Sequence, residues 1–413
     1  ATTVSGTPAI AVPRAAALLV VATLLLSACI TLPRNGLPEA LVDEAVIPGM
    51  PDGLRAPGGR IDPVFMADLV LSFAQDSRDD FPVDADGSVH YPHLTLSGGG
   101  ANGAFGAGVL SGWSSTGTRP VFKIVTGVST GALMAPFAFL GPEHDDTLKL
   151  FYTTTTSSRI FRRLPIIRQL VSGESLADAA PLQSMIADVV DQALLDQIAL
   201  AHGQGRRLYV GTADIDAQRF MVWNLGLLAA SGRPGALELF RKIMLASASI
   251  PIAFQPVLFE VEARGQRYDE LHVDGAVGTN VFYSGGVFDF AQAREQAGEL
   301  AAREDIYIIH NGQLASTHAT TSRTLGSIAL RSLAAAGKSS AIGDLFRIYA
   351  VARRNQAGFY WVTMPAGISL EGEEVFDPTL MAQLFDLGFE MSQLETYWKS
   401  SPPGLARPGE EVR

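Results

Sequence analysis

The chain has 413 residues, a hydrophobic content of 47%, a charged content of 18% and a net charge of −11 at pH 7. This length is enough for one large domain or two ordinary ones, and the apolar content can fill a sizeable core. The acidic balance argues against nucleic acid as a partner, because nucleic-acid-binding domains carry basic surfaces. The histidines and the single cysteine show no zinc or iron spacing, so we predict no metal and no cofactor.

An uncharged apolar stretch over residues 15–26 leads into the sequence LSAC, which ends at Cys29. Its length suits the apolar segment of a signal peptide better than a membrane span. Cys29 is the only cysteine, so it has no partner for an intramolecular disulfide. The LSAC sequence resembles the lipobox of bacterial lipoproteins. We therefore expect a lipoprotein signal peptide over 1–28, a lipid on Cys29 and a membrane-anchored protein of the bacterial cell envelope; the alternative is a cysteine buried in an N-terminal apolar helix.

Residues 29–61 are predicted to form a flexible tether between this anchor and a folded domain. Five prolines and five glycines fall within 31–61, and the segment has no sustained hydrophobic periodicity. A short helix over 63–74 is expected on the outside of the domain, which we place at 62–400. Residues 401–413 form a polar, proline-containing tail.

Two strand–turn–helix units follow one another over 93–131. The first turn has the sequence GGGANG from Gly98 to Gly103, and its glycines let backbone amides approach a ligand closely. Such amides are what an acyl-transfer enzyme directs at a developing oxyanion. The same pattern also fits a dinucleotide-binding loop, but the acidic residue expected about 20 residues later is missing.

The second turn has the sequence GVSTG, from Gly127 to Gly131, with Ser129 at its centre. In this pattern the serine lies on a sharp bend between a strand and a helix, and its hydroxyl projects clear of the sheet. Gly127 and Gly131 remove side chains that would collide at the bend. The alternative is an ordinary glycine-bounded loop with a serine that caps the helix.

A basic and apolar segment over 151–176 follows the expected helix at 130–140. It contains Arg159, Arg162, Arg163 and Arg168 among isoleucines and leucines. Either this segment is a flap that contacts anionic lipid, or it is a solvated connection.

The rest of the chain alternates between expected strands and helices. We predict strands at 207–213, 219–225, 271–273, 305–309 and 358–364, and helices at 182–199, 238–249, within 322–354 (two helices) and at 377–398. This alternation indicates a mainly parallel sheet covered on both faces. The expected fold is an α/β class, three-layer α/β/α sandwich.

The two glycine turns, a segment from Ala246 to Phe254 and the sequence Asp274-Gly275-Ala276 together resemble the patatin-like phospholipases over about 93–283. The resemblance implies a patatin-like fold and a lipid acyl hydrolase that works through a Ser–Asp dyad and an acyl-enzyme. Many members have Arg or Lys where this chain has Asn102, which leaves open how a phosphorylated head group is held. The implied residues are the nucleophile Ser129, the base Asp274 within the Asp-Gly-Ala motif (Gly275, Ala276), the elbow glycines Gly127 and Gly131, and an oxyanion hole of Gly98, Gly99, Gly100 and Gly103.

Two alternatives to the dyad stay open. An α/β-hydrolase would need a histidine downstream of the acid; His310 is the best candidate and His318 the next, while His272 precedes Asp274 in the chain. A structural role is expected for all three. The other alternative is a lipoprotein that binds acyl chains without turnover.

Overall fold

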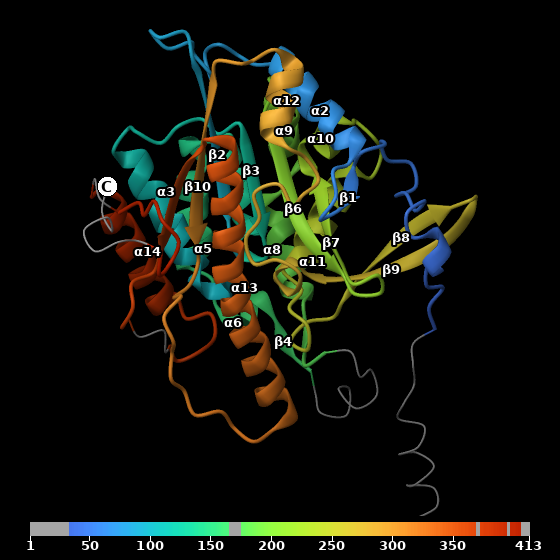
Figure 1. Ribbon diagram of the computed structural model, residues 1–413. Helices are drawn as coiled ribbons and strands as arrows, with labels where there is room; N and C mark the ends of the chain where they lie inside the picture. Colours follow the sequence, from blue (N-terminus) through green and yellow to red (C-terminus); the bar gives the residue numbers. More distant parts are fainter. Residues whose placement is uncertain (1–32, 165–174, 369–371, 395–396, 406–413) are drawn as a thin grey trace, which may run out of the picture.

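The computed structural model describes residues 33–164, 175–368, 372–394 and 397–405 (Figure 1). At the centre of these residues lies a nine-stranded sheet in the order β1-β7-β6-β3-β2-β10-β11, with the hairpin β8–β9 attached to β6. Its strands are β1 (Arg55–Pro57), β2 (Val89–Leu96), β3 (Ile124–Val128), β6 (Arg207–Asp214), β7 (Arg219–Asn224), β8 (Val257–Ala263), β9 (Gln266–Asp274), β10 (Ala302–His310) and β11 (Gly358–Thr363). A separate two-stranded ribbon joins β4 (Arg162–Arg163) to β5 (Ala177–Asp178).

Helices cover both faces of the sheet (Figure 1). Along β6, Leu208 and Val210 pack in one core and Tyr209 in the other, so the strand is buried on both sides. The strands β6, β3, β2, β10 and β11 run parallel to one another, whereas β7 and β9 pair antiparallel with β6. The predicted three-layer α/β/α sandwich with a mainly parallel sheet is therefore confirmed.

The helices divide between the two faces. Residues of α2 (Pro63–Ala74), α12 (Phe290–Ala297) and the C-terminal half of α13 (Leu325–Asn355) line one core. The other core is lined by α3 (Gly103–Ser115), α4 (Thr130–Leu140), α5 (Asp145–Thr153), α6 (Ser157–Ile160), α8 (Ala180–Val189), α9 (Gln192–Gly203), α10 (Leu225–Ala230), α11 (Ala236–Ser247) and α14 (Pro378–Ser392).

The helix starts follow from local chemistry. The Asp62 side chain accepts hydrogen bonds from the amides of Val64 and Phe65, and a proline occupies the first position of α2. Asp377 caps α14 in the same way, again with a proline at the first position. The predicted helices at 63–74 and near 377 are therefore confirmed in position, although α14 ends at Ser392.

The predicted tether is wrong for the residues that the structure describes, 33–61. Strand β1 pairs antiparallel with β7, and Leu54 and Ala56 are buried. Isolated bridges join Gly36 to Asp269 and Val46 to Glu262 on the hairpin. Each of these contacts involves only one to three residues. The segment therefore has no hydrophobic periodicity in its sequence, although it is held to the sheet at several points.

Two helix predictions also differ from the structure. The expected helix at 182–199 is two helices, α8 and α9, because the chain turns at Val190 and the Asp191 carboxylate caps α9 by accepting from the Leu194 amide at 2.9 Å. The two helices expected within 322–354 are one, α13, which continues through its glycines. In Figure 1 the N-terminal half of α13 extends away from the sheet, and its buried residues begin only at Ala341.

Candidate active site

Strand β6 brings the serine and the aspartate together. On one side of β6, strand β3 ends with Val128 opposite Gly211. The next residue of β6, Thr212, pairs on that same side with Asp274, the last residue of β9. Ser129 follows Val128 directly, so the register of two neighbours on one strand places both residues at the same point of the sheet.

Ser129 lies in a strained backbone conformation, with φ 55° and ψ −124°. Its amide donates to Ser247 Oγ at 3.0 Å, and Ser247 Oγ donates to the Gly211 carbonyl at 2.7 Å. A Cβ on Gly127 would lie 2.4 Å from the Gly131 carbonyl oxygen, so the bend closes only around glycine. A Cβ on Gly131 would likewise lie 2.3 Å from the Leu96 carbonyl oxygen.

The hydroxyl of Ser129 donates to Asp274 Oδ2 at 2.6 Å. The Ala276 amide donates to Oδ1 of the same carboxylate at 2.8 Å, at the start of the Asp274-Gly275-Ala276 turn. Burial raises the pKa of Asp274 to about 7, although both hydrogen bonds act to lower it. This carboxylate can therefore accept and release a proton near neutral pH.

Two of the four glycine amides predicted for the oxyanion hole are engaged elsewhere. The Gly98 amide donates to the Asn280 carbonyl at 3.1 Å, and the Gly103 amide donates within the turn that opens α3. The prediction is therefore corrected to Gly99 and Gly100, which line a cavity together with Ser129. Gly98 instead lies against the nucleophile, since a Cβ there would be 3.2 Å from the Cβ of Ser129.

Ser247 and Asn311 complete this arrangement and were not predicted. Asn311 directly follows β10. Its backbone amide donates to Ser97 Oγ at 2.8 Å, and its side-chain amide donates to the Ser97 carbonyl at 2.9 Å. The backbone carbonyl oxygen of Asn311 would be only 2.1 Å from a Cβ on Gly99, so glycine is required there. A sequence signal existed for Ser247 alone, which falls in the 246–254 segment.

Two cavities meet at Ser129. The larger cavity, of about 520 Å³, opens to solvent and is lined by the glycine turn, Asn102, Asp274 and one side of α13. The smaller, of about 40 Å³, has an almost wholly apolar lining that includes Leu133, Phe151, Ile160, Leu182, Phe254, Phe376 and Met381. The nucleophile thus lies between a large cavity of mixed polar and apolar lining and a narrow, apolar one.

The predicted histidines lie outside the serine–aspartate pair. His310 lines the larger cavity, but its Nδ1 is 2.9 Å from Thr363 Oγ1, and burial lowers its pKa to about 4. His272 contacts Thr212 and Glu270, and His318 is exposed in a loop. Among the described residues, the Asp274 carboxylate accepts hydrogen bonds from Ser129 and Ala276.

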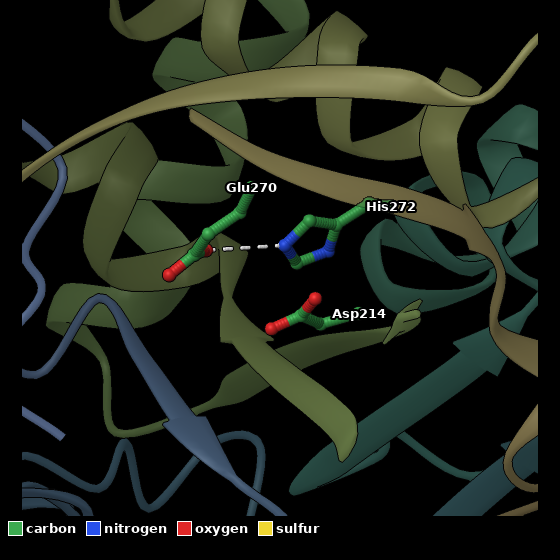
Figure 2. Close-up of side chains that lie close together, drawn as sticks. All are labelled: Asp214, Glu270 and His272. Atoms are coloured by element: carbon green, nitrogen blue, oxygen red, sulfur yellow. Dashed lines mark hydrogen bonds and ion pairs between the residues drawn. The ribbon is translucent and has the colours of Figure 1, made fainter. Parts of the chain in front are cut away.

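His272 belongs to a buried cluster with Asp214 and Glu270 whose ligand atoms lie within 4.8 Å of one another (Figure 2). This spacing suits a metal ion, but the groups already have partners. Arg55 forms a two-point ion pair with Glu270, and His272 bonds to Thr212 and Glu270. Burial raises the pKa of Glu270, yet the hydrogen bonds from His272 and Arg55 outweigh it and hold that pKa at about 2. The cluster thus joins the N-terminal segment to the hairpin.

The basic segment is described in part. Arg159 and Arg162 are exposed, Arg163 belongs to the β4–β5 ribbon, and Arg168 lies outside the described residues, as do Cys29 and the predicted signal peptide. No helix in the described part of the chain is both long and apolar enough to cross a bilayer.

A serine on a strained bend, hydrogen-bonded to a buried carboxylate and close to glycine amides, is the arrangement that a serine hydrolase requires. Residues 94–284, which include every one of these groups, match the family model of the patatin-like phospholipases. The matched stretch is less than half of the chain, and it makes this part of the chain similar to the patatin-like phospholipases.

Solved structures add distant likenesses. VipD from Legionella pneumophila is 11% identical with a TM-score of 0.36, over 78% of this chain and 71% of VipD. Human GIVD cytosolic phospholipase A2 is 10% identical with a TM-score of 0.37, over 83% of this chain and 67% of that one. Similarity at this level says nothing about the activity of this chain. No curated protein sequence matches it.

Proposed function

We propose that this chain is a serine lipid acyl hydrolase that cleaves fatty-acyl esters through a Ser129–Asp274 dyad. The observation that carries the proposal is the 2.6 Å hydrogen bond from the Ser129 hydroxyl to a buried carboxylate at the junction of two cavities. The family match over 94–284 supports the lipid substrate class.

In the first half of the reaction, Ser129 Oγ attacks the acyl carbonyl while Asp274 Oδ2 accepts the hydroxyl proton. The carbonyl oxygen becomes an oxyanion that the Gly99 and Gly100 amides stabilise. Asp274 then gives the proton to the departing alcohol oxygen, and the acyl group remains on Ser129. A carboxylate with a pKa of about 7 suits both the acceptance and the return of this proton.

In the second half, water attacks the acyl-enzyme. Asp274 takes a proton from the water and returns it to Ser129 Oγ as the acyl–oxygen bond breaks, which releases the fatty acid. The narrow apolar cavity suits the first carbons of the acyl chain, because burial of each methylene there is favourable by about 0.8 kcal/mol. The larger cavity then receives the alcohol part of the ester.

The site also lies, in this proposal, on an envelope lipoprotein anchored through Cys29, with Arg159 and Arg162 adding attraction to anionic lipid. The supporting observations are the LSAC sequence after an apolar stretch and the exposure of both arginines. Cys29→Ser should release the protein into the soluble fraction. Continued sedimentation with membranes would contradict a lipid anchor.

The dyad proposal is tested by labelling with a fluorophosphonate and by ester hydrolysis. We expect the wild-type protein to be labelled at Ser129, and Ser129→Ala to lose both labelling and turnover while it keeps the wild-type melting temperature within a few degrees. Ser339→Ala, which removes an exposed hydroxyl on α13, is the matched control. A wild-type protein that binds fatty acids but is neither labelled nor active would instead be the non-catalytic lipid binder.

A further inference from the structure

Helix α13 places two basic side chains on the wall of the larger cavity. Arg331 and Lys338 both line it, together with Leu330, Leu333, Ala334 and Gly337. The two are seven residues apart, so they lie on the same face of the helix. A Cβ on Gly337 would be 3.9 Å from the side-chain amide of Asn280, whose carbonyl accepts the Gly98 amide. Asn280 therefore lies between this face of α13 and the glycine turn.

Neither basic side chain has an acidic partner among the described residues. They bond to neutral oxygens of the preceding loop: Arg331 donates to the Thr317 carbonyl at 2.7 Å, and Lys338 donates to the Ala315 carbonyl at 2.5 Å. Partial burial lowers the pKa of Lys338, and the charge of Arg331 lowers it further. The two cations thus repel each other with no carboxylate between them.

The cavity holds one other charged group, Asp274, and that carboxylate is occupied by Ser129 and Ala276. The field of Lys338 extends into the cavity, since it is one cause of the lowered pKa of His310. An anion between Lys338 and Arg331 would relieve their repulsion and gain charge-assisted hydrogen bonds. Asn102, which is uncharged, lines the same cavity.

We propose that Lys338 and Arg331 bind the phosphate of a glycerophospholipid whose ester carbonyl lies at Ser129. This inference rests on the proposed acyl hydrolase function and assigns the two residues that distinguish a phospholipid from a neutral lipid. The glycerol phosphate belongs to the alcohol part of the ester. With the acyl chain in the apolar cavity, the phosphate therefore falls on the side of Ser129 where α13 provides the two cations.

The test compares two substrates with identical acyl chains, phosphatidylglycerol and diacylglycerol, in micelles of one nonionic detergent. We expect Lys338→Met to raise KM for phosphatidylglycerol about tenfold with kcat nearly unchanged, because loss of a hydrogen bond to a charged group weakens binding about tenfold. Arg331→Gln should act in the same direction. Diacylglycerol hydrolysis should stay at the wild-type rate in both variants, and Lys338→Arg should restore most of the phosphatidylglycerol affinity.

Arg353→Met is the matched control, because Arg353 is an exposed cation on the same helix that does not line the cavity. Equal losses on both substrates would show that Lys338 and Arg331 only support the 313–323 loop, and would overturn the proposal. Equal activity of all variants on phosphatidylglycerol would also overturn it. Diacylglycerol doped with a non-hydrolysable anionic lipid gives a further arm, in which a loss specific to the variants would indicate surface attraction in place of phosphate binding. A wild-type protein inactive on both substrates would refute the acyl hydrolase function itself.

Discussion

The protonation state of Asp274 should set the acidic limb of the activity profile. The carboxylate must be ionised to accept the Ser129 proton, and its pKa is about 7. About nine-tenths of the free enzyme is then competent at pH 8, about a tenth at pH 6 and about a hundredth at pH 5. We therefore expect kcat/KM to fall about 100-fold from pH 8 to pH 5. A carboxylate at the ordinary value of 3.8 would leave kcat/KM almost constant over this range.

The assay is initial-rate hydrolysis of a water-soluble short-chain ester, with circular dichroism at each pH to show that the fold persists. A catalytic histidine would give a limb near 6.5, close to the expected one, so variants must separate the two. His310→Gln should keep both the limb and most of the rate, because His310 has a pKa of about 4 and bonds to Thr363. Asp274→Asn should lose about 10²–10⁴-fold in kcat. A flat profile down to pH 5, or a folded His310→Gln as inactive as Asp274→Asn, would refute the dyad.

Three further substitutions test contacts of the fold, two near Ser129 and one at Lys123. Ser247→Ala removes the acceptor of the Ser129 amide and should lower kcat about tenfold with the pH limb unmoved, which a pH–rate profile of the variant checks. Gly99→Ala would place a Cβ 2.1 Å from a backbone carbonyl, so we expect loss of activity and a lower melting temperature; an active, equally stable variant would contradict the close approach. Asp76→Asn strips the buried Lys123 of its ion-pair partner and should cost about 3–5 kcal/mol in free energy of unfolding by urea denaturation, whereas a change below about 1 kcal/mol would mean that Lys123 finds solvent.

The features that could be predicted from the sequence are those encoded within a few adjacent residues. The two glycine turns, the bend at Ser129 and the caps at Asp62 and Asp377 are local, and the structure has each where its residues indicate. The pairing of Ser129 with Asp274 spans 145 positions, and no local pattern predicts it. There the family resemblance supplied what periodicity could not.

What could not be predicted depends on contacts between distant segments. The Gly98 amide cannot bind the oxyanion because it donates to the Asn280 carbonyl, and nothing around Gly98 in the sequence indicates this contact. Strand β1 is too short to carry a period and exists because β7 offers it an edge. Helix α13 continues past Gly337 although glycine in a helix interior costs up to about 1 kcal/mol, and its buried residues begin only at Ala341.

The attachment of the N-terminal segment sets how far the folded body would lie from a membrane under the proposed anchor at Cys29. Arg34 forms ion pairs with Asp216 and Asp269, so the folded body begins only a few residues after Cys29. Those residues, fully extended, span at most about 18 Å. An acyl anchor on Cys29 would therefore act as a short stalk that holds one side of the body against the bilayer, and the enzyme would search for substrate by diffusing in two dimensions with the membrane.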